Sequence, residues 1–205
     1  MRDIKVALAG DTGVGKSSLV TYLVKDSFSP RVQPLVPEIL LPLDVTEPGV
    51  TTRIVDTSTA HADRDHRQGG KDRRPHLEAT LRSSQVILLV YDISNPTTFD
   101  RIPTYWLPYI RSLGINDVPV ILVGNKIDLR ADHDAAFTNE ALEEELAPIM
   151  SEFKEVESCI ETSVKEGVNV SEIFYYAQKV SRGGPPRSFV NSRTHSPSCG
   201  RDSIH

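Results

Sequence analysis

Short apolar segments alternate with amphipathic stretches along most of this chain. Six segments have the composition of strands: residues 4–9, 39–45, 51–55, 86–91, 118–123 and 156–161. Between and after them, apolar residues recur at helical spacing in residues 17–25, 97–113, 139–153 and 170–180. Strands that alternate with helices are typical of a parallel sheet with helices on its faces. We therefore predict an α/β fold with a mostly parallel six-stranded sheet flanked by helices.

Glycine and proline mark the boundaries of this pattern. Pro103 and Pro108 are expected to start or kink the helix that contains them, and Gly114 is expected to end it. Beyond residue 181, the sequence is rich in Gly, Pro and Ser and shows no apolar periodicity. We expect one domain at residues 1–181 and a disordered tail at residues 182–205.

The composition narrows the classes of partner. Lys and Arg total 23 against 28 Asp and Glu, a net charge of −5, so there is no positive excess to bind nucleic acid or an anionic membrane. The longest apolar run, residues 86–91, is far shorter than the ~20 residues of a membrane span. No signal peptide is visible, and two cysteines, Cys159 and Cys199, do not suggest a disulfide framework. We expect a soluble cytoplasmic protein with no membrane anchor in this chain and no nucleic-acid partner.

A glycine-rich motif follows the first expected strand. Residues 10–17, GDTGVGKS, match the phosphate-loop pattern G-x-x-x-x-G-K-[ST] at every fixed position. Glycines let the backbone wrap round phosphate with successive N–H groups pointing inward, and the following helix adds its positive N-terminus. We expect Lys16 to reach the β- and γ-phosphates and stabilise charge during catalysis, and the Ser17 hydroxyl to bind Mg²⁺. The nucleotide-binding candidates here are Gly13, Val14, Gly15, Lys16, Ser17 and Ser18.

A second motif selects the base. Asn125, Lys126 and Asp128 belong to the tetrapeptide NKID, which follows a buried segment and so lies at the carboxyl end of an expected strand. The Asp128 carboxylate can accept two parallel hydrogen bonds from the N1–H and the exocyclic amine of guanine. Adenine lacks both donors and would leave a desolvated carboxylate unpaired, so the motif favours GTP over ATP. After the last strand, ETSVK is expected to place backbone N–H groups beside the base at Ser163, Val164 and Lys165.

Together these motifs resemble those of one protein superfamily. GDTGVGKS, the aspartate in IVDTS, NKID and ETSVK have the order and spacing of Ras-like small GTPases. Longer segments resemble the N-terminal GTPase domain of Miro, the mitochondrial Rho-like GTPases, over about residues 3–180. The matching text is SLVTYLVKDSF, VQPLVPEI, TRIVDTS, ILLVYDIS, WLPYIRSLG, LVGNKIDL and SEIFYYAQK.

The resemblance implies a P-loop small GTPase that binds GTP and GDP with Mg²⁺ and hydrolyses GTP to GDP. It places Phe28 against the guanine base, Asp56 on Mg²⁺ through water, and Ser58 among the nucleotide-binding residues. It also implies an exchange factor, an activating protein and effectors as partners. Within a full-length Miro protein, such a domain would lie at the cytosolic face of the mitochondrial outer membrane and serve mitochondrial organisation or transport.

Two catalytic positions depart from the Ras-like pattern. The switch threonine that ligates Mg²⁺ is replaced by Leu35, so only a main-chain carbonyl near Pro34 could serve the metal there. The water-orienting glutamine is replaced by Ala60, and the glycine before it by a threonine. Residues 61–75 are polar and are interpreted as a solvated loop, in which Gln68 comes eight residues too late to be equivalent. We therefore predict slow intrinsic hydrolysis.

Two other classes are compatible with nucleotide binding. One is a nucleotide-locked interaction module, which binds GTP to order its loops and recruit partners without meaningful turnover. The other is an ordinary Rho or vesicle-traffic GTPase, which would be expected to end in a prenylated C-a-a-X box. Cys199 is seventh from the end of the printed sequence, which does not match such a box. Full Miro proteins also carry EF-hands, a second GTPase domain and a membrane anchor, and no counterpart of these is recognised in the printed residues.

Overall fold

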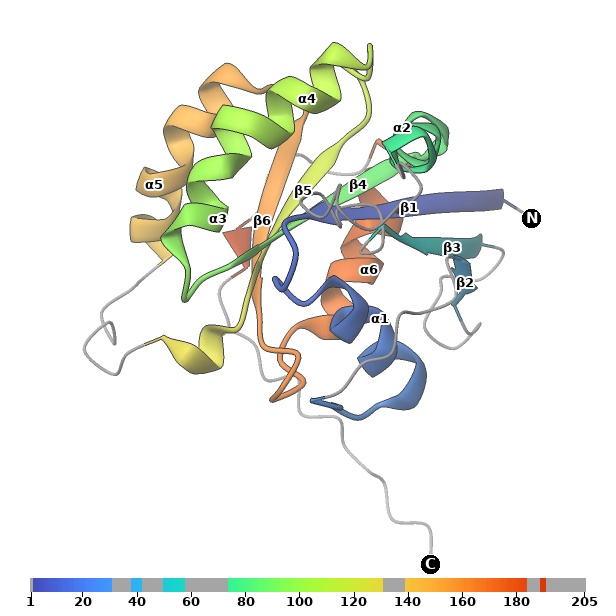
Figure 1. Cartoon of the computed structure of the whole chain (residues 1–205), viewed down its shortest axis with the longest axis vertical. Helices are drawn as coiled ribbons and strands as arrows, with labels where there is room; N and C mark the ends of the chain where they lie inside the picture. Colours follow the sequence, from blue (N-terminus) through green and yellow to red (C-terminus); the bar gives the residue numbers. More distant parts are fainter. Residues whose placement is uncertain are drawn as a thin grey trace, which may run out of the picture.

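The computed structural model describes residues 2–30, 38–41, 50–57, 74–130, 139–183 and 189–190. Their core is a sheet of seven strands in the order β2-β3-β1-β4-β5-β6-β7 (Figure 1). The strands are β1 (Arg2–Gly10), β2 (Glu38–Leu40), β3 (Val50–Asp56), β4 (Val86–Asp92), β5 (Val120–Asn125), β6 (Val156–Thr162) and β7 (Phe189–Val190). The β2–β3 pair is antiparallel, and the other pairs are parallel.

Helices cover both faces of this sheet. They are α1 (Lys16–Lys25), α2 (Arg74–Ser83), α3 (Pro96–Arg101), the π-helical turn η2 (Ile102–Trp106), α4 (Leu107–Ser112), the 3-10 turn η3 (Ile127–Leu129), α5 (Asn139–Glu152) and α6 (Val170–Val180). In Figure 1, α3, α4 and α5 lie together on one side of the sheet, and α1 and α6 lie on the other. No helix within the described ranges is long and apolar enough to cross a membrane.

Successive side chains of each strand point to opposite faces of the sheet, so a hydrophobic layer lies on each face. In β1, Ala7 and Ala9 face one layer, and Val6 and Leu8 face the other. The first layer takes side chains from α2, α4 and α5 and includes Trp106, and the second takes side chains from α1 and α6. Because both faces of the sheet are covered, β4 and β5 are buried at every position.

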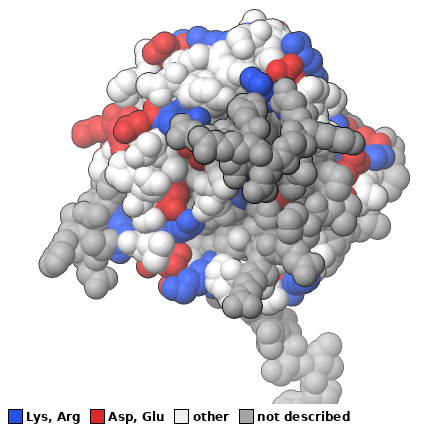
Figure 2. Space-filling view, in the orientation of Figure 1, with Lys and Arg blue, Asp and Glu red and all other residues white. Residues whose placement is uncertain are grey.

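Charged side chains are unevenly distributed over the surface. On the face shown in Figure 2, acidic side chains gather over α5, where Glu140, Glu143 and Glu144 are exposed. Elsewhere on this face, basic and acidic side chains are interspersed. The acidic group therefore lies beside the layer of α4 and α5 and not at the loop that precedes α1.

The predicted α/β architecture is confirmed, and a strand forms in each of the six segments expected to contain one. The segment at 118–123 starts its strand at Val120, because Pro119 has no N–H for the ladder. β7 is an additional strand, which pairs parallel to β6 and comes from the segment 182–205. Most of that segment lies outside the described residues, so the domain boundary at residue 181 stays a prediction.

The helix expected at 97–113 is interrupted at its prolines. Pro103 lies within the π-helical turn η2, and Pro108 lies in the first turn of α4. Gly114 follows with a φ of +75°, as expected of a glycine that ends a helix. The expectation that the prolines would start or disturb the helix is confirmed, and so is the glycine at its C-terminal end.

Helix α2 has no counterpart among the expected helices. Its buried residues are Leu77, Thr80 and Leu81, out of ten, which is too few to give a clear apolar pattern in the sequence. It begins at Arg74, so the last two residues of the loop expected at 61–75 are helical instead. The rest of that loop lies outside the described residues.

Candidate nucleotide-binding site

The phosphate loop joins the end of β1 to the start of α1. Gly10 and Gly15 have positive φ values of +127° and +102°. A Cβ on Gly10 would lie 2.1 Å from the carbonyl oxygen of Val90, and one on Gly15 would lie 2.2 Å from Asn125 Nδ2. Only glycine fits these two positions, so the loop packs tightly against β4 and β5. Because α1 begins at Lys16, the free N–H groups of its first turn lie at the same place.

Lys16 is a buried cation at the base of this loop. It is 2% exposed, and its ammonium donates to the carbonyl oxygens of Gly10, at 2.8 Å, and Asp11, at 2.7 Å. Burial lowers the pKa of Lys16 to about 8, against the opposing effect of the Asp56 and Asp11 carboxylates. A phosphate group bound at the loop would supply the negative charge that favours the protonated amine.

Ser17 and Asp56 bring a hydroxyl and a carboxylate together. Ser17 Oγ donates to Asp56 Oδ2 at 2.5 Å, which joins the first turn of α1 to the end of β3. Asp56 is only 6% exposed. Hydroxyl and carboxylate oxygens are the hard ligands that Mg²⁺ prefers, and both meet beside the phosphate loop. These two residues therefore fit a Mg²⁺ ion whose remaining ligands are water and phosphate oxygens.

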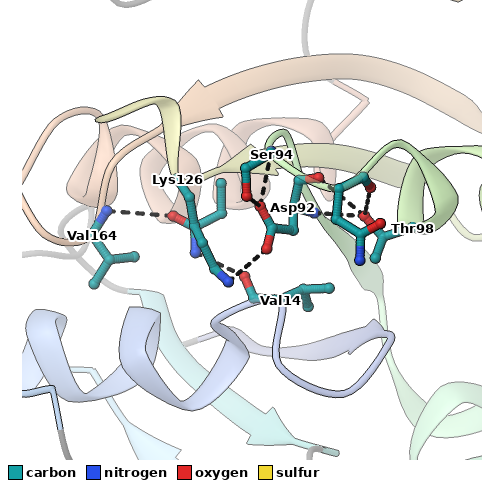
Figure 3. Close-up of polar contacts among 8 residues, drawn as sticks. Val14, Asp92, Ser94, Thr98, Lys126 and Val164 are labelled. Atoms are coloured by element: carbon teal, nitrogen blue, oxygen red, sulfur yellow. Dashed lines mark hydrogen bonds and ion pairs between the residues drawn. The ribbon is translucent and has the colours of Figure 1, made fainter. Parts of the chain in front are cut away.

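Asn125 connects the phosphate loop to the segments expected at the base. Its Nδ2 donates to the carbonyl oxygen of Val14 at 2.8 Å, and its Oδ1 accepts from the N–H of Val164 at 3.4 Å (Figure 3). The residue is 2% exposed, so these bonds are shielded from water. One side chain at the end of β5 thus ties together the loops that follow β1 and β6.

Lys126 is held by the carboxylate of Asp92 (Figure 3). Lys126 Nζ lies 2.6 Å from Asp92 Oδ2, and Asp92 Oδ1 accepts from the N–H and the hydroxyl of Ser94 at 2.9 and 2.6 Å. Burial alone would raise the pKa of Asp92, but the bonds from Lys126 and Ser94 outweigh it and lower the pKa below its usual value. Lys126 itself has a left-handed backbone, with a φ of +70°.

Asp128 presents an almost fully buried carboxylate. Its side chain is 5% exposed, its Oδ1 accepts from the hydroxyl of Ser163 at 2.7 Å, and its Oδ2 lies 3.4 Å from Lys165 Nζ. Each carboxylate oxygen can accept more than one hydrogen bond, so both retain capacity for a ligand. The ETSVK segment therefore holds Asp128 in place as well as lying beside it.

A second ion pair braces these segments. Arg130, which follows η3, contacts both carboxylate oxygens of Glu161, one of them at 2.9 Å. The Glu161 side chain is 1% exposed, and the Asn169 side chain donates to the Glu161 carbonyl oxygen at 2.8 Å. Because this pair is bidentate and shielded from water, it fixes the orientation of the NKID turn relative to the end of β6.

A cleft of about 290 Å³ lies between these elements. It is lined by Gly13, Gly15, Ser18, Phe28, Asn125, Lys126, Asp128, Leu129, Val164 and Lys165. Nine of these ten residues are candidates from the sequence motifs and the family resemblance. Leu129 is the exception, and it is 54% exposed. The sequence signal that could have identified it is the position of an apolar residue directly after the NKID motif.

The remaining candidate residues are not among the described residues that line the cleft. Val14 and Ser163 do not line the cleft but bond to the side chains of Asn125 and Asp128, which do. Lys16, Ser17 and Asp56 lie together at the start of α1 and the end of β3, where the sequence predicts the phosphates and the metal. Pro34 and Ser58 lie outside the described residues, as do Leu35 and Ala60. Asp92, Arg130 and Glu161 were missed because each acts through a partner that lies 31 or 34 positions away.

Comparison with known proteins decides the family. A sequence profile described as the Ras family matches residues 5–182. The chain belongs to the Ras family. Among curated relatives, this Ras-family chain is 53% identical to Mitochondrial Rho GTPase 1 of Mycosarcoma maydis over 200 residues, which cover 97% of the chain and 25% of the relative.

Two further relatives carry the same name. The protein of Cryptococcus neoformans var. neoformans is 47% identical over 198 residues, covering 96% of the chain and 27% of the relative. That of Arabidopsis thaliana is 36% identical over 178 residues, covering 87% of the chain and 25% of the relative. The resemblance to Miro is therefore confirmed, and this Ras-family chain spans about a quarter of the length of the relatives it matches.

Proposed function

We propose that this Ras-family domain binds Mg²⁺-GTP in the cleft and hydrolyses it slowly to GDP and phosphate. The observation that carries the proposal is the contact of Asn125 with Val14, because it sets a guanine-compatible carboxylate and a phosphate-compatible loop at the two ends of one cleft. Members of the family are small GTPases, so the proposal assigns to named residues an activity that the family already implies.

The base end selects guanine through Asp128. Its carboxylate, fixed by Ser163, would accept from the N1–H and the exocyclic amine of the base. Phe28 is 41% exposed at the rim of the cleft and would cover one face of the ring. The backbone N–H groups at Val164 and Lys165 would complete the recognition of the base edge.

The phosphate end holds charge through the loop and Lys16. Backbone N–H groups of the loop and of the first turn of α1 would bind phosphate oxygens, and the Lys16 ammonium would neutralise charge on the β- and γ-phosphates. Ser17 and Asp56 would hold the Mg²⁺ ion. When bound, that ion would neutralise part of the charge that develops on the phosphates during transfer to water.

Slow turnover follows from the residues that should orient the attacking water. The position of the water-orienting glutamine is occupied by Ala60, whose methyl group has no donor or acceptor, and Leu35 offers the metal no hydroxyl. Complete Ras-type sites turn over at about 10⁻⁴ s⁻¹ without their activator. We propose that this domain is no faster on its own and depends on an activating protein.

The relatives suggest where such a switch would act. They are named Mitochondrial Rho GTPase 1, and the segment that they share with this chain covers 97% and 96% of it. We propose that the domain serves mitochondrial organisation or transport at the cytosolic face of the outer membrane, with an exchange factor, an activating protein and effectors as partners.

The substitutions at Leu35 and Ala60 also favour a second candidate. A nucleotide-locked module would bind GTP, order its loops and recruit partners without meaningful turnover. Single-turnover phosphate release separates the two: a rate near 10⁻⁴ s⁻¹ supports a slow enzyme, and release indistinguishable from buffer supports the locked module.

The binding proposal itself is tested by the nucleotide that copurifies with the protein, together with titration of nucleotide-free protein with fluorescent GDP and ADP. GDP or GTP in the preparation, and tight binding of the GDP probe alone, are the expected results. Adenine nucleotide in the preparation, or tighter binding of the ADP probe, would overturn the assignment of the base end.

A further inference from the structure

Asp11 is an acidic residue inside the phosphate loop, and it faces away from the cleft. Its Oδ1 accepts from the indole N–H of Trp106 at 3.1 Å and lies 3.2 Å from Arg101 Nη1. Its own main-chain carbonyl accepts from Lys16 Nζ at 2.7 Å. One residue therefore contacts the layer of α3 and α4 through its side chain, and the catalytic lysine through its backbone.

Trp106, which contacts this loop, is the last residue of the π-helical turn. Residues Ile102–Trp106 form a wide turn in which the N–H of Leu107 bonds to the carbonyl oxygen of Ile102. A π-helical turn holds more residues than an α-helical one, which rotates the following side chains by about 100° relative to an uninterrupted helix. Trp106 is 1% exposed, so its N–H needs a partner inside the protein, and Asp11 supplies it.

The charges at this contact also fit a phosphate-binding role. A carboxylate next to a site for phosphate oxygens would repel the ligand unless its charge were compensated. Arg101 and the Trp106 N–H compensate it on the side away from the cleft. The Arg101 guanidinium also lies over the Tyr105 ring, 4.7 Å from its centroid, so its position is fixed by two contacts.

We propose that Asp11 is a positioning residue for nucleotide binding: by anchoring the phosphate loop to the π-helical turn, it holds its own carbonyl where that oxygen fixes the Lys16 ammonium. The inference rests on the proposed function, since it takes the ligand of the loop to be a guanine nucleotide. Asp11 acts through Lys16 and the loop backbone, without contact to the ligand.

A purely structural role makes a different prediction. If the contact between Asp11 and Trp106 only stabilised the fold, its loss would lower the free energy of unfolding but leave nucleotide release from the folded protein unchanged. A positioning role changes the release rate itself. The two are distinguished by measuring GDP dissociation and urea unfolding on the same variants.

The test uses Asp11→Ala, Trp106→Phe and the double variant, with release of a fluorescent GDP analogue in the presence of Mg²⁺ as the readout. Each single variant is expected to release GDP about tenfold faster, because each removes the charge-assisted hydrogen bond between the indole and Asp11, and Asp11→Ala also removes the ion pair with Arg101. The double variant should be no faster than the faster single one, since both changes remove the same contact. Asp11→Asn keeps an acceptor for the indole and should restore most of the parent behaviour.

Asp100→Ala is the matched control, since Asp100 is an exposed aspartate on α3 next to Arg101. It should release GDP at the parent rate. Trp106 is the sole tryptophan in the sequence, so intrinsic emission reports its contact directly, without nucleotide. Nucleotide-free Asp11→Ala should show a shifted emission spectrum, and Asp100→Ala should not.

The possible failures are separable. A parent protein that binds no guanine nucleotide overturns the proposed function. A parent that binds GDP while Asp11→Ala releases it at the same rate overturns only the positioning role, as does a double variant whose effect is the product of the two single effects.

Discussion

The side-chain amide of Asn125 donates to the carbonyl oxygen of Val14 at 2.8 Å, across 111 positions of sequence. The bond holds the phosphate loop against the NKID turn, so each end of the cleft depends on the other. We expect Asn125→Ala to release GDP at least about tenfold faster, because it removes two buried hydrogen bonds worth about 1 kcal/mol each. Stopped-flow displacement of a fluorescent GDP analogue measures the rate.

Gly15→Ala tests the same contact from the loop side. The new Cβ would lie 2.2 Å from Asn125 Nδ2 and displace the amide, so its effect on GDP release should match that of Asn125→Ala. Gly114→Ala is the control for backbone strain alone, since its φ is +75° and nothing lies within 4 Å of the added carbon. Release at the parent rate from Gly15→Ala would show that the loop does not rely on this amide.

Asp128→Asn should change the base that the cleft prefers. Loss of a charged acceptor for two guanine donors should weaken GTP binding by at least about 100-fold, from roughly 3 kcal/mol. The new amide can donate to the extra carbonyl of xanthine, so xanthosine diphosphate should now compete with the fluorescent GDP probe. Equal GTP affinity in variant and parent, measured by calorimetry, would remove Asp128 from the base site.

Removal of Mg²⁺ should separate the roles of Ser17 and Lys16. In the parent, a chelator should speed GDP release, because the proposed ion would join Ser17 and Asp56 to the phosphates. Ser17→Ala should already release GDP fast and respond little to the chelator, whereas Lys16→Ala should lose tight binding of the triphosphate altogether. Ser112→Ala, an exposed serine on α4, is the matched control and should respond as the parent does. A full chelator response in Ser17→Ala would contradict the metal assignment.

The ion pair of Asp92 and Lys126 should make stability depend on pH. The folded pKa of Asp92 lies below its ordinary value, so its contribution is present above the unfolded pKa of ~3.9 and is lost as the pH falls through the folded value. Asp92→Asn should therefore be less stable than the parent at pH 7 and pH 5, with the gap closing below about pH 4. Urea unfolding across this range checks the sign, and a gap that widens in acid would refute it.

Phosphate release should locate any residual catalysis. We expect a single-turnover rate at or below about 10⁻⁴ s⁻¹, because Ala60 cannot orient water. The candidate substitutes are Gln68, Arg64, Arg67, Arg73 and Arg74; the first four lie outside the described residues, and Arg74 is the first residue of α2. Deleting residues 66–73, which ends the deletion before α2, should leave the rate unchanged. A parent rate far above about 10⁻³ s⁻¹ that collapses on deletion would place catalysis in this segment.

The sheet and the ligand-binding motifs could be predicted because their signals are local. Val86 to Tyr91 is a short uninterrupted apolar run, as expected of a strand with two covered faces. The phosphate loop and NKID are short motifs whose chemistry follows from consecutive residues. Their position at the carboxyl ends of β1 and β5 then follows from the parallel topology.

The rest depends on contacts that no local pattern records. Asp11 and Trp106 are 95 positions apart, and no sequence pattern in either segment predicts their hydrogen bond. Trp106 ends a π-helical turn, whereas Pro103 predicted only that the helix would be disturbed. Helix α2 escaped detection because its apolar face is narrow, and β7 because two residues are too few to form a pattern.

Lys126, in the NKID turn, has a left-handed backbone, a conformation that residues other than glycine disfavour. A non-glycine residue at a φ of +70° costs on the order of 1–2 kcal/mol, and two contacts hold Lys126 there: the Asp92 carboxylate on its ammonium, and the N–H of Leu129 on its carbonyl oxygen. The NKID turn is therefore strained at Lys126, and the ion pair with Asp92 helps to keep it in this conformation. Loss of the contact between Asp92 and Lys126 would favour relaxation of the turn, and a relaxed turn would no longer place Asp128 for the base.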